Sequence, residues 1–340
     1  LDKQKIKGWK IDKFMGDEEI IRDFTDELPE GIGKALKEPF IKNGRKDLET
    51  RFTYEELDKV RRNLQNVLWV NGGTDDNDVF ISLVNIILAK IQDELEKGEG
   101  EIYDFQIFSL KDGQSFETNE QLFERINELY RRALKQRLNI IDEAKLKKSY
   151  VIDENKFSLN KLKYTVSELE RFSFVDGRDS FSGKDILGYF FEKIMRDKFK
   201  QAKGQFFTHI NVVKFILWGL QLDKLAIERV NNDLEIPYII DPSAGSGTFL
   251  IEYMKFITEN IKGRFRDKIK KTRDVEDKIH QWFMLDHREN KWASNFIYGL
   301  EINFNLATAT KVNMILHGGG STNIFVQDGL LPFKYYEKET

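Results

Sequence analysis

A short strand, a glycine-containing turn and a helix follow one another near residue 240, and this succession constrains the fold more than any other feature. Tyr238-Ile239-Ile240 is an apolar run typical of a buried strand. It leads into Asp241-Pro242-Ser243-Ala244-Gly245-Ser246-Gly247, and a helical pattern over 248–261 follows directly. Two glycines let the backbone turn tightly beside a ligand, and the helix start offers free N–H groups. The segment therefore predicts a ligand-binding βα unit.

The same alternation continues to the end of the chain. A second strand is predicted over 296–300, a helix over 304–316 and a third strand over 323–326. Strands that alternate with helices indicate a parallel, doubly wound sheet. A dinucleotide fingerprint would place a third glycine where this chain has Leu250. The first two strand ends lie 60 residues apart, and we interpret the charged stretch 262–290 as an insertion.

One carboxylate follows each of the three predicted strands. These are Asp241, Glu301 and Asp328. Each alone would pass for an ordinary loop cap, but the carboxyl edge of an open α/β sheet is where ligands bind. Glu301 could accept hydrogen bonds from two ribose hydroxyls, and Asp328 from the exocyclic amine of adenine. The three together favour a nucleoside site, with no room for a Cβ at Gly245 or Gly247 beside the ligand.

The first half of the chain has a different pattern. Apolar residues at helical spacing predict helices over 54–68, 79–95 and 118–148. A hairpin-like stretch lies around 103–116, and a turn-like stretch over 28–33. These residues predict a mainly α-helical domain.

Composition excludes several classes of protein. No cysteine is present, which removes disulfides and thiolate chemistry, and with four histidines we expect no metal site. No apolar run approaches the roughly 20 residues of a membrane span, and we expect a cytoplasmic protein. The net charge of −3 gives no overall basic field. The first residue is Leu1, and we expect an internal piece of a longer chain.

Two basic stretches could contact nucleic acid or be solvated surface. The first lies near the end of the predicted helix over 118–148, where cations also suit the helix dipole. The second lies in the predicted insertion. The first comprises Arg131, Arg132, Lys135, Arg137, Lys145, Lys147 and Lys148, and the second comprises Lys262, Arg264, Arg266, Lys268, Lys270, Lys271 and Arg273.

Several separated motifs together resemble the N6-adenine DNA methyltransferases, and most closely the modification subunits of type I restriction systems and their single-chain relatives. The turn over 241–250 resembles motif I of that family. Segments 185–192 and 204–208 resemble its motif X, although His209 stands where members usually have proline. Segments 299–303 and 313–318 are similar to its second motif and the helix after it. The resemblance covers about residues 185–330.

The resemblance implies an S-adenosylmethionine site on a Rossmann-like α/β methyltransferase domain. Gln205 to Thr208 would cover the methionine end, and Asp241 with the glycine turn would hold the amino-acid group. Glu301 would bind the ribose and Asp328 the adenine amine. The implied cofactor-binding residues are Gln205, Phe206, Phe207, Thr208, Asp241, Pro242, Ser243, Ala244, Gly245, Ser246, Gly247, Thr248, Glu301, Ile302 and Asp328.

One family motif is missing from these 340 residues. The catalytic tetrapeptide Asn/Asp-Pro-Pro-Tyr/Phe should follow Asp328, and no two of the five prolines are adjacent. We therefore assign no catalytic residue and expect this piece alone to be inactive. We divide it into a helical domain over 1–165, contacting DNA or partners, and a partial methyltransferase domain over 166–340.

The resemblance implies methylation of adenine N6 in double-stranded DNA within a restriction-modification or related defence system. Implied partners are DNA and specificity and restriction subunits or domains, with no membrane. One alternative is a non-catalytic DNA-recognition module that retains a cofactor pocket. Another is methylation of protein glutamine or of RNA, whose enzymes share the catalytic motif.

Overall fold

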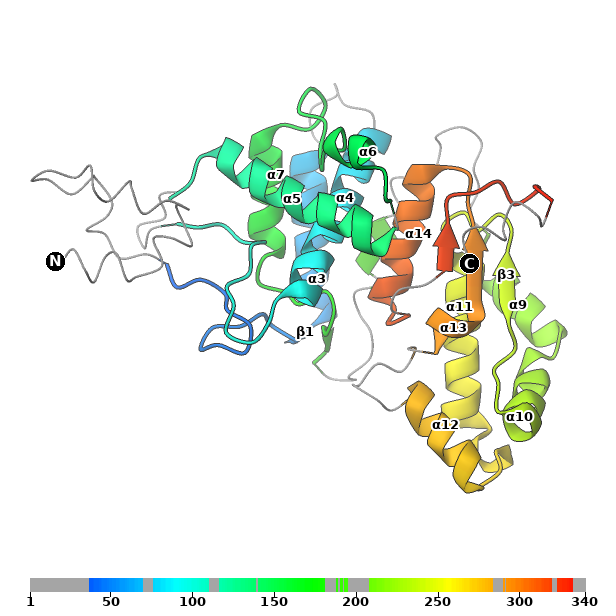
Figure 1. Cartoon of the computed structure of the whole chain (residues 1–340). Helices are drawn as coiled ribbons and strands as arrows, with labels where there is room; N and C mark the ends of the chain where they lie inside the picture. The colour runs from blue at the N-terminus through cyan, green and yellow to red at the C-terminus, as the bar shows by residue number, and fades with distance from the viewer. Residues whose placement is uncertain are drawn as a thin grey trace, which may run out of the picture.

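The chain folds into a helical part and a sheet part, with helix α14 (Phe304–Leu316) between them (Figure 1). The computed structural model describes residues 37–69, 76–109, 116–138, 140–180, 188, 190–191, 193–194, 208–283, 290, 292–319 and 323–332. The turn predicted over 28–33 lies outside these residues. Among the described helices, none combines the length and apolarity needed to cross a bilayer.

The helical part confirms two of its three predicted helices and corrects the third. The prediction over 54–68 is confirmed in full, and the helix predicted over 79–95 is extended slightly at both ends. The continuous helix predicted over 118–148 is wrong. It breaks after Arg137, and the Asp142 carboxylate starts a new short helix by accepting from the amides of Ala144 and Lys145. The elements are β1 (Arg51–Phe52), α3 (Tyr54–Leu68), α4 (Asp76–Glu96), α5 (Asn119–Arg137), α6 (Glu143–Lys147), α7 (Leu159–Leu169) and β2 (Arg178–Asp179).

The hairpin-like stretch predicted around 103–116 is only partly described. Ile102 forms an antiparallel bridge with Ile41, and the Phe116 amide donates to the Phe108 carbonyl at 2.9 Å. Residues 110–115, which include the expected turn, lie outside the described residues. The described ends of the stretch therefore approach each other as a hairpin requires.

The sheet part contains three parallel strands in the order β3-β4-β5, which confirms the predicted α/β fold. Asp241 pairs with Gly299, and Leu300 pairs with Phe325, so the three carboxyl ends meet at one edge. The arrows in Figure 1 point the same way. The elements are α9 (Ile210–Gly219), α10 (Leu222–Asp233), β3 (Ile239–Asp241), α11 (Thr248–Thr258), η3 (Glu259–Arg264), η4 (Arg266–Lys268), α12 (Arg273–Phe283), α13 (Ala293–Phe296), β4 (Ile297–Leu300), α14 and β5 (Asn323–Phe325).

Much of the predicted insertion is described, and residues 262–283 form part of the sheet part. The helix predicted over 248–261 changes at Thr258 into the π-helical turn η3. Helix α12 then buries its apolar face in the core of the sheet part. This second core therefore includes residues that charge alone assigns to an insertion; the four buried residues of α12 are Val275, Ile279, Trp282 and Phe283.

Helix α14 is buried on every side, because both parts of the molecule pack on it. One face joins the helical core, where α14 packs against α4. The opposite face, which includes Ala307 and Met314, joins the core of the sheet part. A helix without a solvent face is expected to be apolar all round. The residues that contact the helical core are Leu306, Ala309, Val312, Ile315 and Leu316.

The buried ammonium of Lys311 on α14 predicts a pH-dependent stability. Its side chain is 4% exposed, and burial, with a smaller contribution from Arg137, lowers its pKa to about 8. The unfolded chain holds this proton up to about pH 10.4. Below pH 8 Lys311 is charged in both the folded and the unfolded chain, so the folded state carries the full cost of burying the ammonium. As the pH rises from 8 to 10.4, Lys311 loses its proton in the folded chain first, so the free energy of unfolding rises.

We expect Lys311→Met to be more stable than the parent at pH 7, by an amount on the order of 3 kcal/mol. The difference should shrink as the pH rises toward 10. Urea denaturation at pH 7 and pH 9.5 measures it. A difference that stays constant between the two pH values would contradict the assignment to Lys311.

Candidate functional site

The turn after β3 begins with Asp241, the last residue of the strand. Its Oδ1 accepts a hydrogen bond from the Ser243 amide at 3.0 Å, which folds the chain back over the strand end. Burial raises the pKa of Asp241, while the bond from Ser243 acts in the opposite direction. Pro242 and Ser243 are exposed, whereas Ala244 and Ser246 are buried. The turn thus places a half-buried carboxylate at the edge where the three strands end.

Gly245 and Gly247 both adopt left-handed backbone conformations, with φ of 55° and 78°. Glycine occupies this region without the steric cost that a Cβ brings. The sequence predicts that neither glycine has room for a Cβ beside a ligand; at Gly247 the protein itself leaves no room, and at Gly245 crowding by a ligand stays a prediction. A Cβ on Gly247 would lie 2.8 Å from Thr310 Cγ2, so α14 fills that space, whereas a Cβ on Gly245 would meet only Ser243 O, at 3.8 Å. The open side of the turn is therefore at Gly245.

Glu301 follows β4 and supports the glycine turn directly. Its Oε2 accepts from the Gly245 amide at 3.0 Å, and its Oε1 accepts from the Asn303 amide at 2.9 Å. The side chain is buried, at 8% exposure. Sequence reasoning placed Glu301 at this edge but missed its bond to the turn 56 residues earlier. A carboxylate has about four acceptor positions, so each oxygen can still accept a ligand hydroxyl.

The segment after β5 lies against the turn after β3. Asp328 Oδ1 accepts from the Leu330 amide at 3.0 Å. At Gly329, a Cβ would lie 1.9 Å from the Pro242 carbonyl oxygen, so the two backbones are in direct contact. This contact holds the segment with Asp328 beside the turn that begins at Asp241. The three strand-end carboxylates thus belong to one edge, as predicted.

The remaining predicted residues contribute less to this arrangement. Gln205, Phe206 and Phe207 lie outside the described residues, as does most of the predicted motif X. Thr208 is exposed ahead of α9, and Ile302 is 70% exposed beside Glu301. His209, which stands where the resembling family has proline, starts α9, and its Nδ1 accepts from the Asn211 amide at 3.2 Å. Thr248, at the start of α11, contacts the Ser246 hydroxyl at 2.8 Å.

Two polar residues of α14 hold the back of the turn, and sequence reasoning missed both. The Thr310 hydroxyl donates to the Gly245 carbonyl, and Asn313 Nδ2 donates to the Ser246 carbonyl at 3.3 Å. The available signal was their place in a helix whose other residues are mostly apolar. Such residues are expected to need buried partners.

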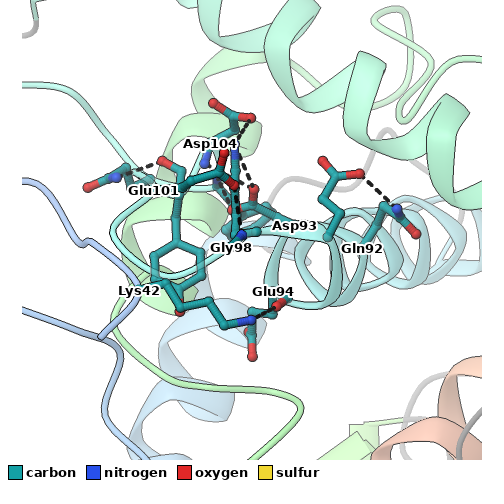
Figure 2. A network of polar contacts seen from close by, with 12 residues as sticks. Lys42, Gln92, Asp93, Glu94, Gly98, Glu101 and Asp104 are labelled. Carbon is teal, nitrogen blue, oxygen red and sulfur yellow. Dashed lines mark hydrogen bonds and ion pairs between the residues drawn. The ribbon is translucent and has the colours of Figure 1, made fainter. Parts of the chain in front are cut away.

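A separate group of carboxylates lies at the end of α4 and comprises Asp93, Glu96 and Asp104. Their oxygens lie within 4.8 Å of one another. Figure 2 labels Asp93 and Asp104. Lys97 contacts Asp104 at 2.6 Å, and Arg132 contacts Glu96 at 2.6 Å, so cations of the chain already neutralise the group. Asp93 also accepts from backbone amides of the following loop, while burial raises its pKa to about 6. We interpret this group as a structural link between α4 and residues 98–105.

The basic stretches are largely engaged within the protein. In the first, Arg132 binds Glu96, and Lys135 binds Glu143 at 2.8 Å. In the second, Arg266 pairs with Glu276, and Lys270 donates to Asn231 and Asn232. Contact of either stretch with DNA stays a prediction.

Comparison with known proteins agrees with this arrangement of motifs. Residues 182–338 match the family model of the N-6 DNA methylases. The similarity to that family therefore lies in the second half of the chain. The match begins just before the predicted motif X and includes β3, β4, β5 and all three strand-end carboxylates. The match therefore covers the same residues that form the candidate site.

One curated relative is the type I restriction enzyme MjaVII methylase subunit of Methanocaldococcus jannaschii. It is 27% identical over 156 residues, which are 45% of this chain and 19% of the relative. The chain thus spans about a fifth of that subunit's length.

Two solved structures also resemble the chain. One is described as a modification subunit of a type I restriction enzyme from Vibrio vulnificus YJ016; it is 15% identical, with a TM-score of 0.45, and the match covers 83% of this chain and 58% of that one. The other is the type I restriction enzyme EcoKI M protein; it is 17% identical, with a TM-score of 0.21, and the match covers 80% and 43%.

Proposed function

We propose that the sheet part of the chain binds S-adenosylmethionine at the carboxyl edge of β3, β4 and β5. The observation that carries the proposal is the bond from the Gly245 amide to Glu301, which joins a glycine turn to a strand-end carboxylate. The open space beside Gly245 and the free acceptor positions of Glu301 suit a nucleoside with a ribose diol. Asp241 and Asp328 then flank that position with two further acceptors.

The proposed reaction of the whole protein is methyl transfer to N6 of adenine in double-stranded DNA, within a restriction-modification system. The cofactor supplies an activated methyl group on a sulfonium. Residues of this chain bind and orient it, and positioning provides much of the rate of such a transfer. The target base must be turned out of the helix and held by groups that these 340 residues do not include, because no Pro-Pro pair occurs in them. We propose that this piece alone binds the cofactor without transferring the methyl group.

The bond between the Gly245 amide and Glu301 also suits a second candidate function. A module that binds DNA and retains the cofactor pocket for regulation would need the turn and Glu301 but not the catalytic tetrapeptide. A methyl-transfer assay with the full-length protein, offered DNA, RNA and protein substrates in parallel, distinguishes the two. Labelled DNA supports the enzyme; labelled RNA or protein instead would replace the proposed substrate; cofactor binding without any transfer favours the module.

Calorimetry with S-adenosylmethionine tests the cofactor site itself. We expect Glu301→Gln to weaken binding roughly tenfold. The glutamine side chain is uncharged and keeps one acceptor oxygen, so it can no longer accept from both the ribose and the backbone N–H of Gly245 with a charged carboxylate. Asp274→Asn, an exposed carboxylate on α12, is the matched control and should bind like the parent. A parent protein that binds no cofactor would overturn the proposal. Equal affinities for Glu301→Gln and the parent would remove Glu301 from the site.

A further inference from the structure

We infer that Thr310 and Asn313 are positioning residues that hold the glycine turn in its ligand-binding conformation. The inference rests on the proposed cofactor site and adds two residues of α14 that bind backbone carbonyls of the turn. Both lie on α14, whose other face packs against α4 of the helical part. The cofactor turn is thereby attached to the helix that joins both parts of the molecule.

The Thr310 hydroxyl lies close to two carbonyl oxygens. It lies within hydrogen-bond distance of Gly245 O and of Leu306 O, one turn earlier in α14, and the contact with Gly245 is the shorter. A hydroxyl carries one proton, so it donates to one carbonyl at a time. We place that proton on the contact with the turn, because the bond to Leu306 O would stay within α14. Thr310 Cγ2 also fills the space beside Gly247, so one side chain fixes both glycines.

Asn313 adds a second contact one helical turn later. Its Nδ2 donates to the Ser246 carbonyl at 3.3 Å, and the side chain is 1% exposed. Its Oδ1 has no hydrogen-bond partner among the described residues. A buried amide that satisfies only one end is costly, which indicates that the contact with the turn is what places it there.

These bonds determine which side of the turn faces outward. With the Gly245 carbonyl bound to α14 and the Gly245 amide bound to Glu301, both backbone groups of this peptide segment are fixed. A Cβ on Gly245 would meet no atom of α14 within 4 Å, whereas Thr310 of α14 fills the space beside Gly247. Loss of the Thr310 bond should let the turn rotate without unfolding the sheet, so cofactor affinity should fall more than stability does.

The test compares Thr310→Val, Thr310→Ser and Thr308→Val. Thr308 is a matched control, because it is equally buried on α14 and donates to Phe304 O of its own helix. Thr310→Val should bind S-adenosylmethionine about three- to tenfold more weakly, the effect of one hydrogen bond. Thr310→Ser, which keeps the hydroxyl, should restore binding, and Thr308→Val should bind like the parent. Equal weakening by both valine variants, or none by Thr310→Val, would overturn the inference.

Amide hydrogen exchange without ligand separates this inference from the proposed function. Thr310→Val should accelerate exchange at the amides of Gly245 and Gly247, which donate to Glu301 and to the Ala244 carbonyl, and Thr308→Val should not. If the parent binds no cofactor but Thr310→Val accelerates exchange, the cofactor proposal fails and the positioning role stands. Unchanged exchange at these amides in Thr310→Val overturns the positioning role, whatever the parent binds.

Discussion

Glu94→Ala is expected to lower the free energy of unfolding by about 3–5 kcal/mol, the range observed when one partner of a buried ion pair is removed. Glu94 Oε1 lies 3.1 Å from Lys90 Nζ, and the two side chains are 4% and 1% exposed. The same carboxylate accepts from the Ser173 hydroxyl and from the amides of Phe174 and Val175, at 2.8 to 3.0 Å. It thus ties α4 to a segment 80 residues later in the chain.

The cost arises from what the substitution leaves behind. Lys90 would keep its contact with the Glu170 carbonyl, at 3.4 Å, and would lose the one carboxylate that it contacts among the described residues. Three donors of residues 173–175 would also lose their acceptor, and each buried unsatisfied group is costly. The rings of Phe105 and Phe174 near the ammonium, at 5.2 and 5.7 Å, offset only part of this.

Urea denaturation followed by circular dichroism measures the effect. Glu143→Ala is the matched control, because the pair of Glu143 with Lys135 has a similar distance, 2.8 Å, but side chains 66% and 55% exposed. Exposed pairs contribute little, so this variant should unfold near the parent midpoint. If the two variants unfold at the same urea concentration, the buried network does not stabilise the helical part as described.

The sequence predicted those elements whose signals are local. The helix over 54–68 was predicted to the residue, because apolar spacing agrees with a capping box in which Thr53 and Glu56 bind each other's backbone. The helix over 304–316 was equally clear, with Asn303 as its cap. The break after Arg137 was missed because basic residues continue through it, although Asp142 is an ordinary helix-starting residue.

The candidate site was predicted in its parts and not in its connections. Strand ends placed Asp241, Glu301 and Asp328 at one edge because parallel strands share their direction. The bond from Gly245 to Glu301 and the contact of Thr310 with the turn join residues more than 50 positions apart. Such contacts depend on how α14 packs between two cores, and no local pattern encodes that packing. Which group of the ligand each of these three carboxylates binds stays a prediction.

Gly329→Ala is expected to weaken S-adenosylmethionine binding by about one to two orders of magnitude, if the cofactor site is as proposed. The reason is steric, because an added Cβ would lie 1.9 Å from the Pro242 oxygen and 2.8 Å from its carbonyl carbon. Backbone atoms cannot rotate away as a side chain can, so the segment after β5 must move off the turn and take Asp328 with it. Overpacking of this kind typically costs 1–3 kcal/mol.

Gly219→Ala provides the control for Gly329→Ala, since a Cβ at Gly219 would meet nothing within 4 Å. Calorimetry should show parent-like affinity for Gly219→Ala and weak binding for Gly329→Ala. Gly329 lies outside the helical core, so the denaturation of that core should be the same in both variants. Parent-like affinity in Gly329→Ala would mean that Asp328 takes no part in binding, because the substitution cannot leave the segment where it is. If only Gly329→Ala binds weakly, the contact between Pro242 and Gly329 holds the segment after β5 in the position that cofactor binding requires.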